Sequence, residues 1–221
     1  MINKQTGTLD AAVSVIRSGS MVLVGGFGEV GMPLRLVEAL SRQAVRDLTV
    51  VSNNAGTGKK GLSLLFKQGL VSKVITAYPA QVGADEFLAA YRRGEVRVEL
   101  VPQGTLSERL RAGGSGLAGF FTPVAYGTEL AQGKETRVID GRGYVYESAI
   151  VGDFALVKAH AADRYGNLRY RLAGRNFNPL MAMAAKHTIV EAESIVPLGD
   201  IAPDDIHTPG VWVDQIVECR P

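Results

Sequence analysis

The sequence predicts an α/β protein with an open, mostly parallel sheet, helices on both faces of that sheet, and β-hairpins added in the C-terminal half. Three observations support this prediction. The first half alternates strand-like runs with segments of helical periodicity, the pattern of a parallel sheet. Runs such as "MVLV" are apolar throughout, as expected for strands covered on both faces. The second half contains pairs of strand-like runs around turn residues.

The first half begins with a predicted helix that Thr8 can cap and that Gly19 ends. A strand over 21–24 follows, and Pro33 suits the first turn of the next helix, with Leu36, Val37 and Leu40 on its inner face. The same alternation predicts strands over 47–52, 72–78 and 96–101, and helices over 61–70, 83–95 and 106–112.

The second half changes in composition near residue 113. Residues 113–129 are rich in glycine but too apolar for a solvated linker, which predicts a packed loop near the functional site. Residues 137–147 predict a hairpin that turns at Asp140-Gly141, a dipeptide suited to a type I′ turn. Further predicted elements are two strands within 154–171 around "DRYGN", a helix over 178–186, and strands over 187–192 and 210–218.

Length and composition are those of an ordinary globular protein. The chain has 221 residues, of which 46% are hydrophobic, 21% charged and 7% aromatic. A chain of this length buries about 70% of its unfolded surface and needs no disulfide or metal for stability. No internal repeat and no clean domain boundary divides it, so we expect a single domain over residues 1–221.

Charge and cysteine usage exclude several classes of protein. The 24 basic and 22 acidic side chains are mixed along the chain, without a run of five like charges, which argues against binding to nucleic acid or an anionic membrane. The one cysteine, Cys219, excludes an internal disulfide. The start "MINKQTGTLDAAV" lacks a secretory hydrophobic region and no apolar run approaches about 18 residues, so a cytoplasmic location is expected.

The stretch "VLVGGFGEVGMP" (22–33) contains G-x-G-x-x-G between a predicted strand and a predicted helix. A dinucleotide-binding unit would need an acidic residue about 20 residues later, at the end of the second strand. That strand ends in Ser52-Asn53-Asn54, without a carboxylate. "NNAGTGKKG" also fails as a phosphate-binding P-loop, because Lys60 stands where Ser or Thr should bind magnesium.

The glycine loop can still bind an anion. Gly25, Gly26, Gly28 and Gly31 allow a ligand to approach the main chain and leave N–H groups free. The helix that begins near Pro33 would add its positive end. Such a loop can hold a phosphate, a carboxylate or a developing oxyanion, and each oxyanion donor contributes about 3–4 kcal/mol. We therefore expect Gly26→Val to abolish turnover and largely keep the fold. The alternative is a tight turn in which the glycines serve packing only.

Neutral amides follow two predicted strands. Asn53 and Asn54 come after the second strand, and Gln103, with Gly104 beside it, comes after the fourth. Ligands bind outside the carboxyl ends of parallel strands, where these amides could orient a thioester carbonyl or a substrate carboxylate. Ordinary turn formation by Asn-Asn is the alternative.

Other reactive side chains form no motif. His160, His187 and His207 are too scattered for a metal site or a catalytic triad, and no Ser lies in G-x-S-x-G. We expect these histidines to be structural, no metal to be bound, and Cys219 to be an incidental thiol. Met181–Ala185 predicts a buried helix.

The glycine loop closely resembles the signature of the A subunit of family I CoA transferases. That signature consists of three aliphatic residues followed by G-G-F-x-x-x-G-x-P. Gly25, Gly26, Phe27, Gly31 and Pro33 match that signature, whereas Ser18-Gly19 stands where the signature favours Asp or Asn before Gly. Similar landmarks follow in order along the chain: "SNNAG" (52–56), "VPQGTLSERLRAGGSG" (101–116), "FFTP" (120–123), "YGTELAQGKE" (126–135), "DRYGNL" (163–168), "RNFNPLMAMAAK" (175–186) and "IHTPG" (206–210).

The resemblance implies transfer of CoA from succinyl-CoA to a 3-oxo acid. "MINK" and "YPAQ" (78–81) are most similar to the 3-oxoadipate enzymes, although Ala80 stands where those enzymes tend to have Arg. Acetoacetate-type relatives, the alternative, share most other landmarks. No cofactor is implied to be bound permanently, because the CoA thioesters are substrates. The implied site loop comprises Gly25, Gly26, Phe27, Gly28, Glu29, Val30 and Gly31.

The resemblance also implies a partner. In this family a glutamate of the B subunit, within Ser-Glu-Asn-Gly, attacks the acyl thioester, and this chain lacks that motif. The chain is then one of the two kinds of subunit in a heterodimer or an α2β2 heterotetramer, and it has no catalytic nucleophile of its own. Two alternatives stay open, namely that Glu29 is the nucleophile and that the chain is a non-catalytic CoA-binding module. Tyr126, Arg175 and Asn176 lie in landmarks without an assigned role.

Overall fold

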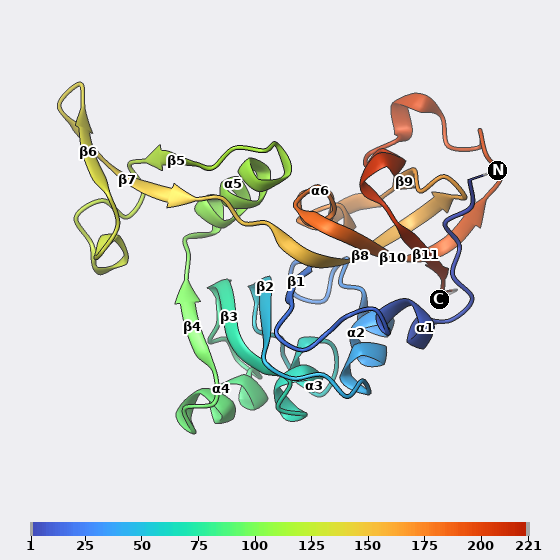
Figure 1. Ribbon diagram of the computed structural model, residues 1–221, viewed down its shortest axis with the longest axis horizontal. Coiled ribbons are helices and arrows are strands. Elements are labelled where there is room, and N and C mark those ends of the chain that lie inside the picture. The colour runs from blue at the N-terminus through green and yellow to red at the C-terminus, as the bar shows by residue number, and fades with distance from the viewer. Residues whose placement is uncertain (1, 220–221) are drawn as a thin grey trace.

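A seven-stranded parallel sheet forms the centre of the molecule (Figure 1). The computed structural model describes residues 2–219. The strand order is β11-β10-β8-β1-β2-β3-β4, and the two-residue strand β9 pairs antiparallel with β8. The bounds are β1 Met21–Val24, β2 Leu48–Asn54, β3 Val71–Tyr78, β4 Arg97–Leu100, β8 Gly152–Asp163, β9 Leu168–Arg169, β10 Ala185–Val196 and β11 Gln215–Glu218.

Helices cover both faces of this sheet, as the sequence predicts. Four helices lie on one face: α1 (Leu9–Val13), α2 (Leu34–Ser41), α3 (Leu62–Lys67) and α4 (Asp85–Arg92). The other face is covered by α5 (Gln103–Gly114) and α6 (Asn178–Met183). Side chains of one strand alternate between the two cores: Val22 and Val24 pack in the first and Leu23 in the second. Each such buried side chain contributes about 1.5–3 kcal/mol.

A second, three-stranded antiparallel sheet extends at one end of the molecule (Figure 1). It consists of β5 (Gly119–Thr122), β6 (Thr136–Ile139) and β7 (Arg142–Ser148). Asp140 and Gly141 connect β6 to β7 with φ angles of 50° and 76°, so the predicted hairpin is confirmed. The prediction of a packed loop over 113–129 is wrong, because this segment contains β5, whose backbone pairs with β7.

Several boundaries differ from the prediction. Thr8 caps α1 by accepting a hydrogen bond from the Ala11 N–H at 3.1 Å, but α1 ends at Val13. Pro33 directly precedes α2, and α5 begins at Gln103, three residues before the predicted helix. The predicted final strand is shortened to β11, because residues 210–212 form a 3₁₀ turn in which Gly210 packs against Tyr165.

The remaining short elements are 3₁₀ turns: Glu129–Ala131, Leu172–Gly174, Pro203–Asp205 and Gly210–Trp212. Between residues 2 and 219, no helix has the length and apolar character needed to cross a bilayer.

Candidate active site

A cleft lies at the carboxyl ends of β1, β2 and β3, the edge where parallel sheets bind ligands. Its volume is about 400 Å³. A neighbouring hollow of about 320 Å³ shares Phe27 and Gln103 with the cleft and adds Gly104 and Asn176 to its lining. The cleft itself is lined by residues from four segments: Phe27, Gly28, Asn53, Asn54, Ala77, Tyr78, Gln81 and Gln103.

The structure thus brings the predicted amides together beside the glycine loop. Asn53 and Asn54 are almost fully buried at the end of β2. The Gln103 side chain donates a hydrogen bond from Nε2 to Asn53 Oδ1 at 2.6 Å. Asn54 Oδ1 instead accepts a hydrogen bond from the Gly56 N–H at 2.8 Å, within its own turn. The turn-forming alternative therefore describes Asn54, whereas Asn53 is held across the cleft by the first residue of α5.

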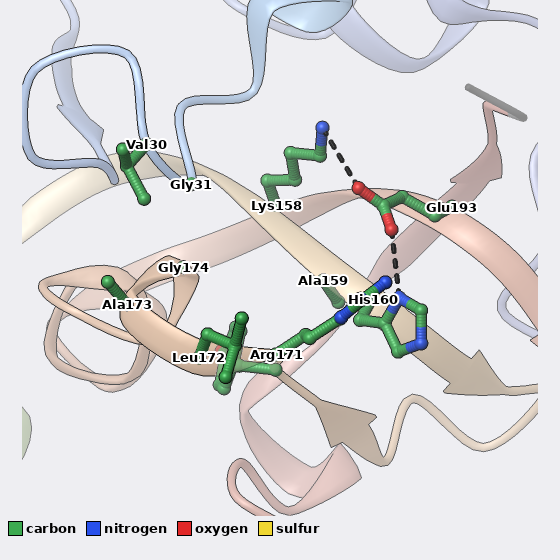
Figure 2. A pocket seen from close by; sticks show the side chains of 11 residues that line it. Val30, Gly31, Lys158, Ala159, His160, Arg171, Leu172, Ala173, Gly174 and Glu193 are labelled. Carbon is green, nitrogen blue, oxygen red and sulfur yellow. Dashed lines mark hydrogen bonds and ion pairs between the residues drawn. The ribbon is translucent and has the colours of Figure 1, made fainter.

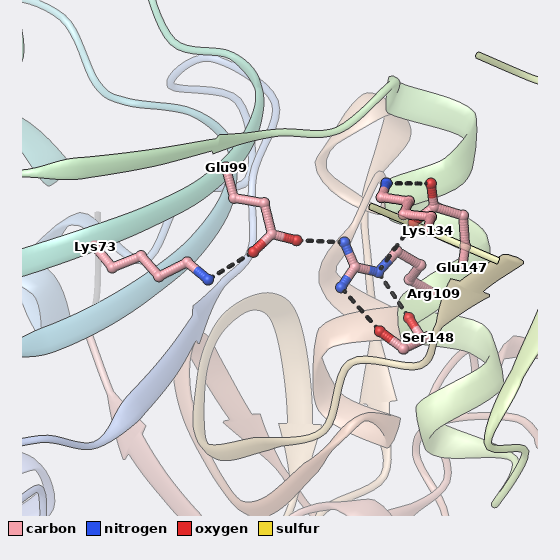
Figure 3. A network of polar contacts seen from close by, with 6 residues as sticks. All are labelled: Lys73, Glu99, Arg109, Lys134, Glu147 and Ser148. Atoms are coloured by element: carbon pink, nitrogen blue, oxygen red, sulfur yellow. Dashed lines mark hydrogen bonds and ion pairs between the residues drawn. The ribbon is translucent and has the colours of Figure 1, made fainter. Parts of the chain in front are cut away.

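A polar network anchors α5, the helix that carries Gln103 (Figure 3). Arg109 is almost fully buried; its Nη1 donates to Glu99 Oε1 and its Nε to the Ser148 carbonyl, each at 2.7 Å. Lys73 and Lys134 pair at 2.6 Å with Glu99 and Glu147, respectively. Burial raises the pKa of Glu99, but hydrogen bonds from Lys73 and Arg109 outweigh it and leave that pKa below its usual value. The network links β3, β4 and the three-stranded sheet to α5.

Most N–H groups of the glycine loop have partners inside the protein. Gly25 donates to the Leu156 carbonyl at 3.0 Å, and Gly26 donates to Asn176 Oδ1 at 3.1 Å. Phe27 and Val30 bond each other's backbone. These N–H groups are not free for a ligand.

The tip of the loop is open. Within the part of the chain that the structure describes, the Gly28, Glu29 and Gly31 N–H groups donate no hydrogen bond. Gly28 has a φ of 61°, and no atom lies within 4 Å of the position that a Cβ would take. Gly25 and Gly31, in contrast, lie directly against Asn178 and Gly174, where a Cβ would clash. At Gly25 and Gly31 a glycine is therefore required by close packing inside the protein. At Gly28 the backbone is open to the close approach of a ligand.

The expectation that the α2 N-terminus adds its positive end to the site is wrong. Glu191 of β10, 3% exposed, accepts hydrogen bonds at Oε2 from the Arg35 and Leu36 N–H groups at 2.9 and 3.1 Å. Burial raises the pKa of Glu191, and these two backbone bonds oppose the rise. The protein thus neutralises this helix end with its own carboxylate. The only signal in the sequence was one acidic residue in the apolar run "HTIVEA".

Glu29 lies outside the cleft. Its Oε2 is 2.8 Å from Lys60 Nζ, and both side chains are at least half exposed. The pair lines a small hollow beside the cleft together with Asn54.

A second cavity, of about 340 Å³, lies behind the glycine loop (Figure 2). Val30 and Gly31 line this cavity, so the structure places them apart from the cleft residues. Glu193 accepts from Lys158 at 3.2 Å and pairs with His160 Nδ1 at 2.8 Å. The bond from His160 lowers the pKa of Glu193, despite partial burial.

The other two histidines also have structural environments. His187 packs edge-on against Phe154, and its Nδ1 is 3.8 Å from Asp214. His207 stacks on Tyr170 and accepts a hydrogen bond at Nδ1 from the Tyr170 N–H at 3.0 Å. Burial, with a contribution from Arg175, lowers the pKa of His207.

The remaining unassigned residues fall outside the cleft lining. Tyr126 packs closely on Gly143 of the three-stranded sheet. Cys219 is buried, and burial raises the pKa of its thiol. Among residues 2–219, no cluster of three His, Cys, Asp or Glu side chains could hold a metal ion.

Comparison with known proteins decides the family. The model of the coenzyme A transferase family matches residues 6–219. The chain belongs to this family. It is 51% identical to the A component of 3-oxoadipate CoA-transferase from Pseudomonas putida, over 98% of this chain and 94% of that protein. It is 45% identical to the A component of succinyl-CoA:3-ketoacid coenzyme A transferase from Helicobacter pylori J99, over 97% of this chain and 92% of that protein.

Solved structures share the fold of this CoA-transferase chain. An acyl-CoA transferase from Escherichia coli O157:H7, in a thioester complex with CoA, superposes with a TM-score of 0.85 at 20% identity. The match covers 98% of this chain and 47% of that one, so the chain spans about half the length of that structure. Glutaconate coenzyme A-transferase from Acidaminococcus fermentans gives a TM-score of 0.84 at 23% identity, over 98% of this chain and 76% of that one.

These findings confirm two sequence-based predictions. The chain is the A component of a family I CoA-transferase, and it has the α/β fold predicted for that component. Sequence reasoning missed Glu191 and Asn178 and gave Asn176 no role, because the partners of these side chains lie about 150 residues away in the chain.

Proposed function

We propose that this chain belongs to an enzyme that transfers CoA from succinyl-CoA to 3-oxoadipate, and that a separate B subunit supplies the nucleophilic glutamate. The observation that carries the proposal is the chemistry of the cleft. Among the described residues that line it, amides, apolar side chains, the Tyr78 phenol and an open backbone at Gly28 occur, but no carboxylate or thiol. A site of this kind can stabilise a reacting acyl group, but it offers no carboxylate that could form an acyl-glutamyl anhydride.

In the proposed mechanism the glutamate of the B subunit attacks the thioester carbonyl of succinyl-CoA. The C–S bond breaks, CoA leaves as the thiolate, and a succinyl-glutamyl anhydride forms. The thiolate then attacks the glutamyl carbonyl, which releases succinate and leaves a glutamyl-CoA thioester. The 3-oxo acid carboxylate attacks this thioester, and the same steps in reverse order give its CoA ester and free glutamate.

Each attack places negative charge on a carbonyl oxygen. The groups of this chain that could stabilise that charge are the Gly28 N–H at the loop tip and the Asn53 amide, both of which belong to residues that line the cleft. An N–H donor aimed at such an oxyanion contributes about 3–4 kcal/mol in a site that excludes water. Asn53 Oδ1 accepts the hydrogen bond from Gln103. The NH₂ group of Asn53 is therefore the end of this amide that can donate to substrate.

Acetoacetate is the alternative acceptor. Ala80 is exposed and adjoins Gln81, which lines the cleft, and here the chain lacks the Arg that the 3-oxoadipate relatives tend to carry. Without that cation the second carboxylate of 3-oxoadipate loses one charged partner. The H. pylori relative, a 3-ketoacid enzyme, is nearly as similar to this chain as the P. putida one.

The decisive experiment tests whether this chain is active alone or only together with a B subunit. We would assay this chain alone, with a B subunit that carries Ser-Glu-Asn-Gly, and with the Glu→Ala variant of that motif, using succinyl-CoA with 3-oxoadipate or acetoacetate. The proposal expects transfer only by the intact pair, faster with 3-oxoadipate. Activity of the isolated chain would make Glu29 the candidate nucleophile, and CoA binding by an inactive pair would favour a non-catalytic module. Size-exclusion chromatography with light scattering distinguishes a heterodimer from an α2β2 heterotetramer.

A further inference from the structure

Two asparagines hold the glycine loop from the side opposite its tip. Asn176, half-buried and just before α6, accepts at Oδ1 from the Gly26 N–H at 3.1 Å. Its Nδ2 donates to the Val30 carbonyl at 3.0 Å. One amide thus bonds the beginning and the end of the loop, 26–30, and the Phe27–Val30 backbone pair closes it in between.

Asn178 adds a second, fully buried attachment. Its Nδ2 donates to the Gly31 carbonyl at 2.9 Å, and its Oδ1 accepts from the Lys158 N–H of β8 at 3.0 Å. Gly25 lies against this side chain so closely that a Cβ would clash with Oδ1. Gly25 directly before the 26–30 loop and Gly31 directly after it therefore both contact Asn178.

The same two amides also bond a second segment. Asn176 Nδ2 donates to the Ala173 carbonyl at 2.7 Å, and Asn178 Nδ2 donates to the Gly174 carbonyl at 2.9 Å. These carbonyls belong to the 3₁₀ turn Leu172–Gly174, which lines the cavity in Figure 2 with Val30. The loop is thus fixed to β8, α6 and this turn, whereas Gly28 and Glu29 at its tip make no hydrogen bond to any of the three among the described residues.

We propose that Asn176 and Asn178 are positioning residues for the CoA-transfer reaction: they set the position of the open loop tip, where Gly28 lines the cleft. This inference rests on the proposed function. Neither asparagine touches the open tip, so each acts through the loop backbone. A displacement of about 1 Å in a positioned group can cost about 100-fold in rate.

The first test uses Asn176→Ala in the assembled enzyme, because Asn176 is only half-buried and its loss leaves the core intact. We expect kcat to fall at least about tenfold, with KM for succinyl-CoA changed by less than about threefold, since the loss is specific to the transition state. Asn176→Asp keeps the acceptor for Gly26 but loses both donated bonds, and should have an intermediate kcat.

Asn167→Ala is the matched control. Asn167 also accepts a backbone bond, from Gly210 at 2.9 Å, and donates from Nδ2, to Asp163 at 2.8 Å, but it lies at the turn between β8 and β9. The Asn167→Ala variant should lower the melting temperature about as much as Asn176→Ala does, but it should leave kcat unchanged. Equal kcat losses in the two variants would overturn the inference.

Hydrogen exchange of the peptide over 25–33 provides a readout that does not depend on activity. We expect Asn176→Ala to accelerate exchange in this peptide and Asn167→Ala to leave it unchanged. If exchange accelerates while kcat stays at the wild-type value, or if neither changes, the positioning role is refuted. If the wild-type pair is inactive but the exchange pattern is as expected, the proposed function is refuted. The conclusion that Asn176 holds the loop would then still be supported.

Discussion

Arg109→Met removes the centre of the polar network that holds α5 against the two sheets. Loss of one member of a buried ion pair costs about 3–5 kcal/mol when its partner is left uncompensated. Here Glu99 and Glu147 each keep a lysine at 2.6 Å, which favours the lower end of that range, while the Ser148 carbonyl loses its 2.7 Å bond. We expect a destabilisation of about 3 kcal/mol, or roughly 6–12 °C in Tm for a chain of this size.

The assay is thermal unfolding of the chain at neutral pH, with Arg111→Met as the control. Arg111 lies on the same helix and pairs at 2.8 Å with Glu108, but both side chains are nearly half exposed. That pair should contribute less than about 0.5 kcal/mol, or under roughly 2 °C. If both substitutions lower Tm equally, the buried network is not what anchors α5, and the account of how Gln103 is positioned fails.

Four further substitutions test other parts of the structure. The pKa of Glu99 is held below its usual value, so the Tm advantage of the wild type over Glu99→Gln should be full above about pH 5 and vanish as pH falls through the lowered pKa, in melts from pH 7 to pH 3. Ala80→Arg should raise the kcat/KM ratio of 3-oxoadipate to acetoacetate about tenfold or more, as a charge-assisted hydrogen bond would, whereas Ala80→Gln should change it little. Gly28→Ala, at a φ of 61° with open space around it, should fold with a loss of about 1–2 kcal/mol and slow turnover, measured by calorimetry and initial rates. Gly26→Val should unfold the loop, because Gly26 has a φ of 117° and its Cβ would lie 3.0 Å from Met32.

The expectation that Gly26→Val unfolds the loop corrects the sequence-based prediction that this variant keeps the fold. From the sequence alone, Gly26 and Gly28 are equivalent glycines of one motif, so a valine at Gly26 should block the site and keep the fold. In the structure Gly26 is packed against Met32 and bonded to Asn176, and only Gly28 is open. Spacing identifies a glycine loop, but the contacts that distinguish its members come from residues 150 positions away.

The sheet and its helices were predictable for the opposite reason. The local sequence of a strand determines which side chains face each core, because successive side chains point to opposite faces of the sheet. Val22 therefore packs in one core and its neighbour Leu23 in the other. The carboxyl edge of the sheet follows from chain direction, and therefore Asn53 and Gln103 could be placed near the glycine loop from sequence. The strand within 113–129 was missed because its stability comes from pairing with β7 and not from a periodic pattern of its own.

The capping of α2 by Glu191 bears on how such a site could favour the transition state. A free helix N-terminus would attract the carboxylate of an entering nucleophile and of succinate or the 3-oxo acid, and so stabilise the ground state as well. Glu191 satisfies the Arg35 and Leu36 N–H groups, and the described cleft lining offers neutral donors instead. Neutral N–H groups at the loop tip can be aimed at the carbonyl oxygen, where charge develops only during attack, and catalysis depends on such differential binding. Under the proposed function, a variant that removes the negative charge at this helix end, such as Glu191→Gln, should therefore bind succinate more tightly and turn over more slowly.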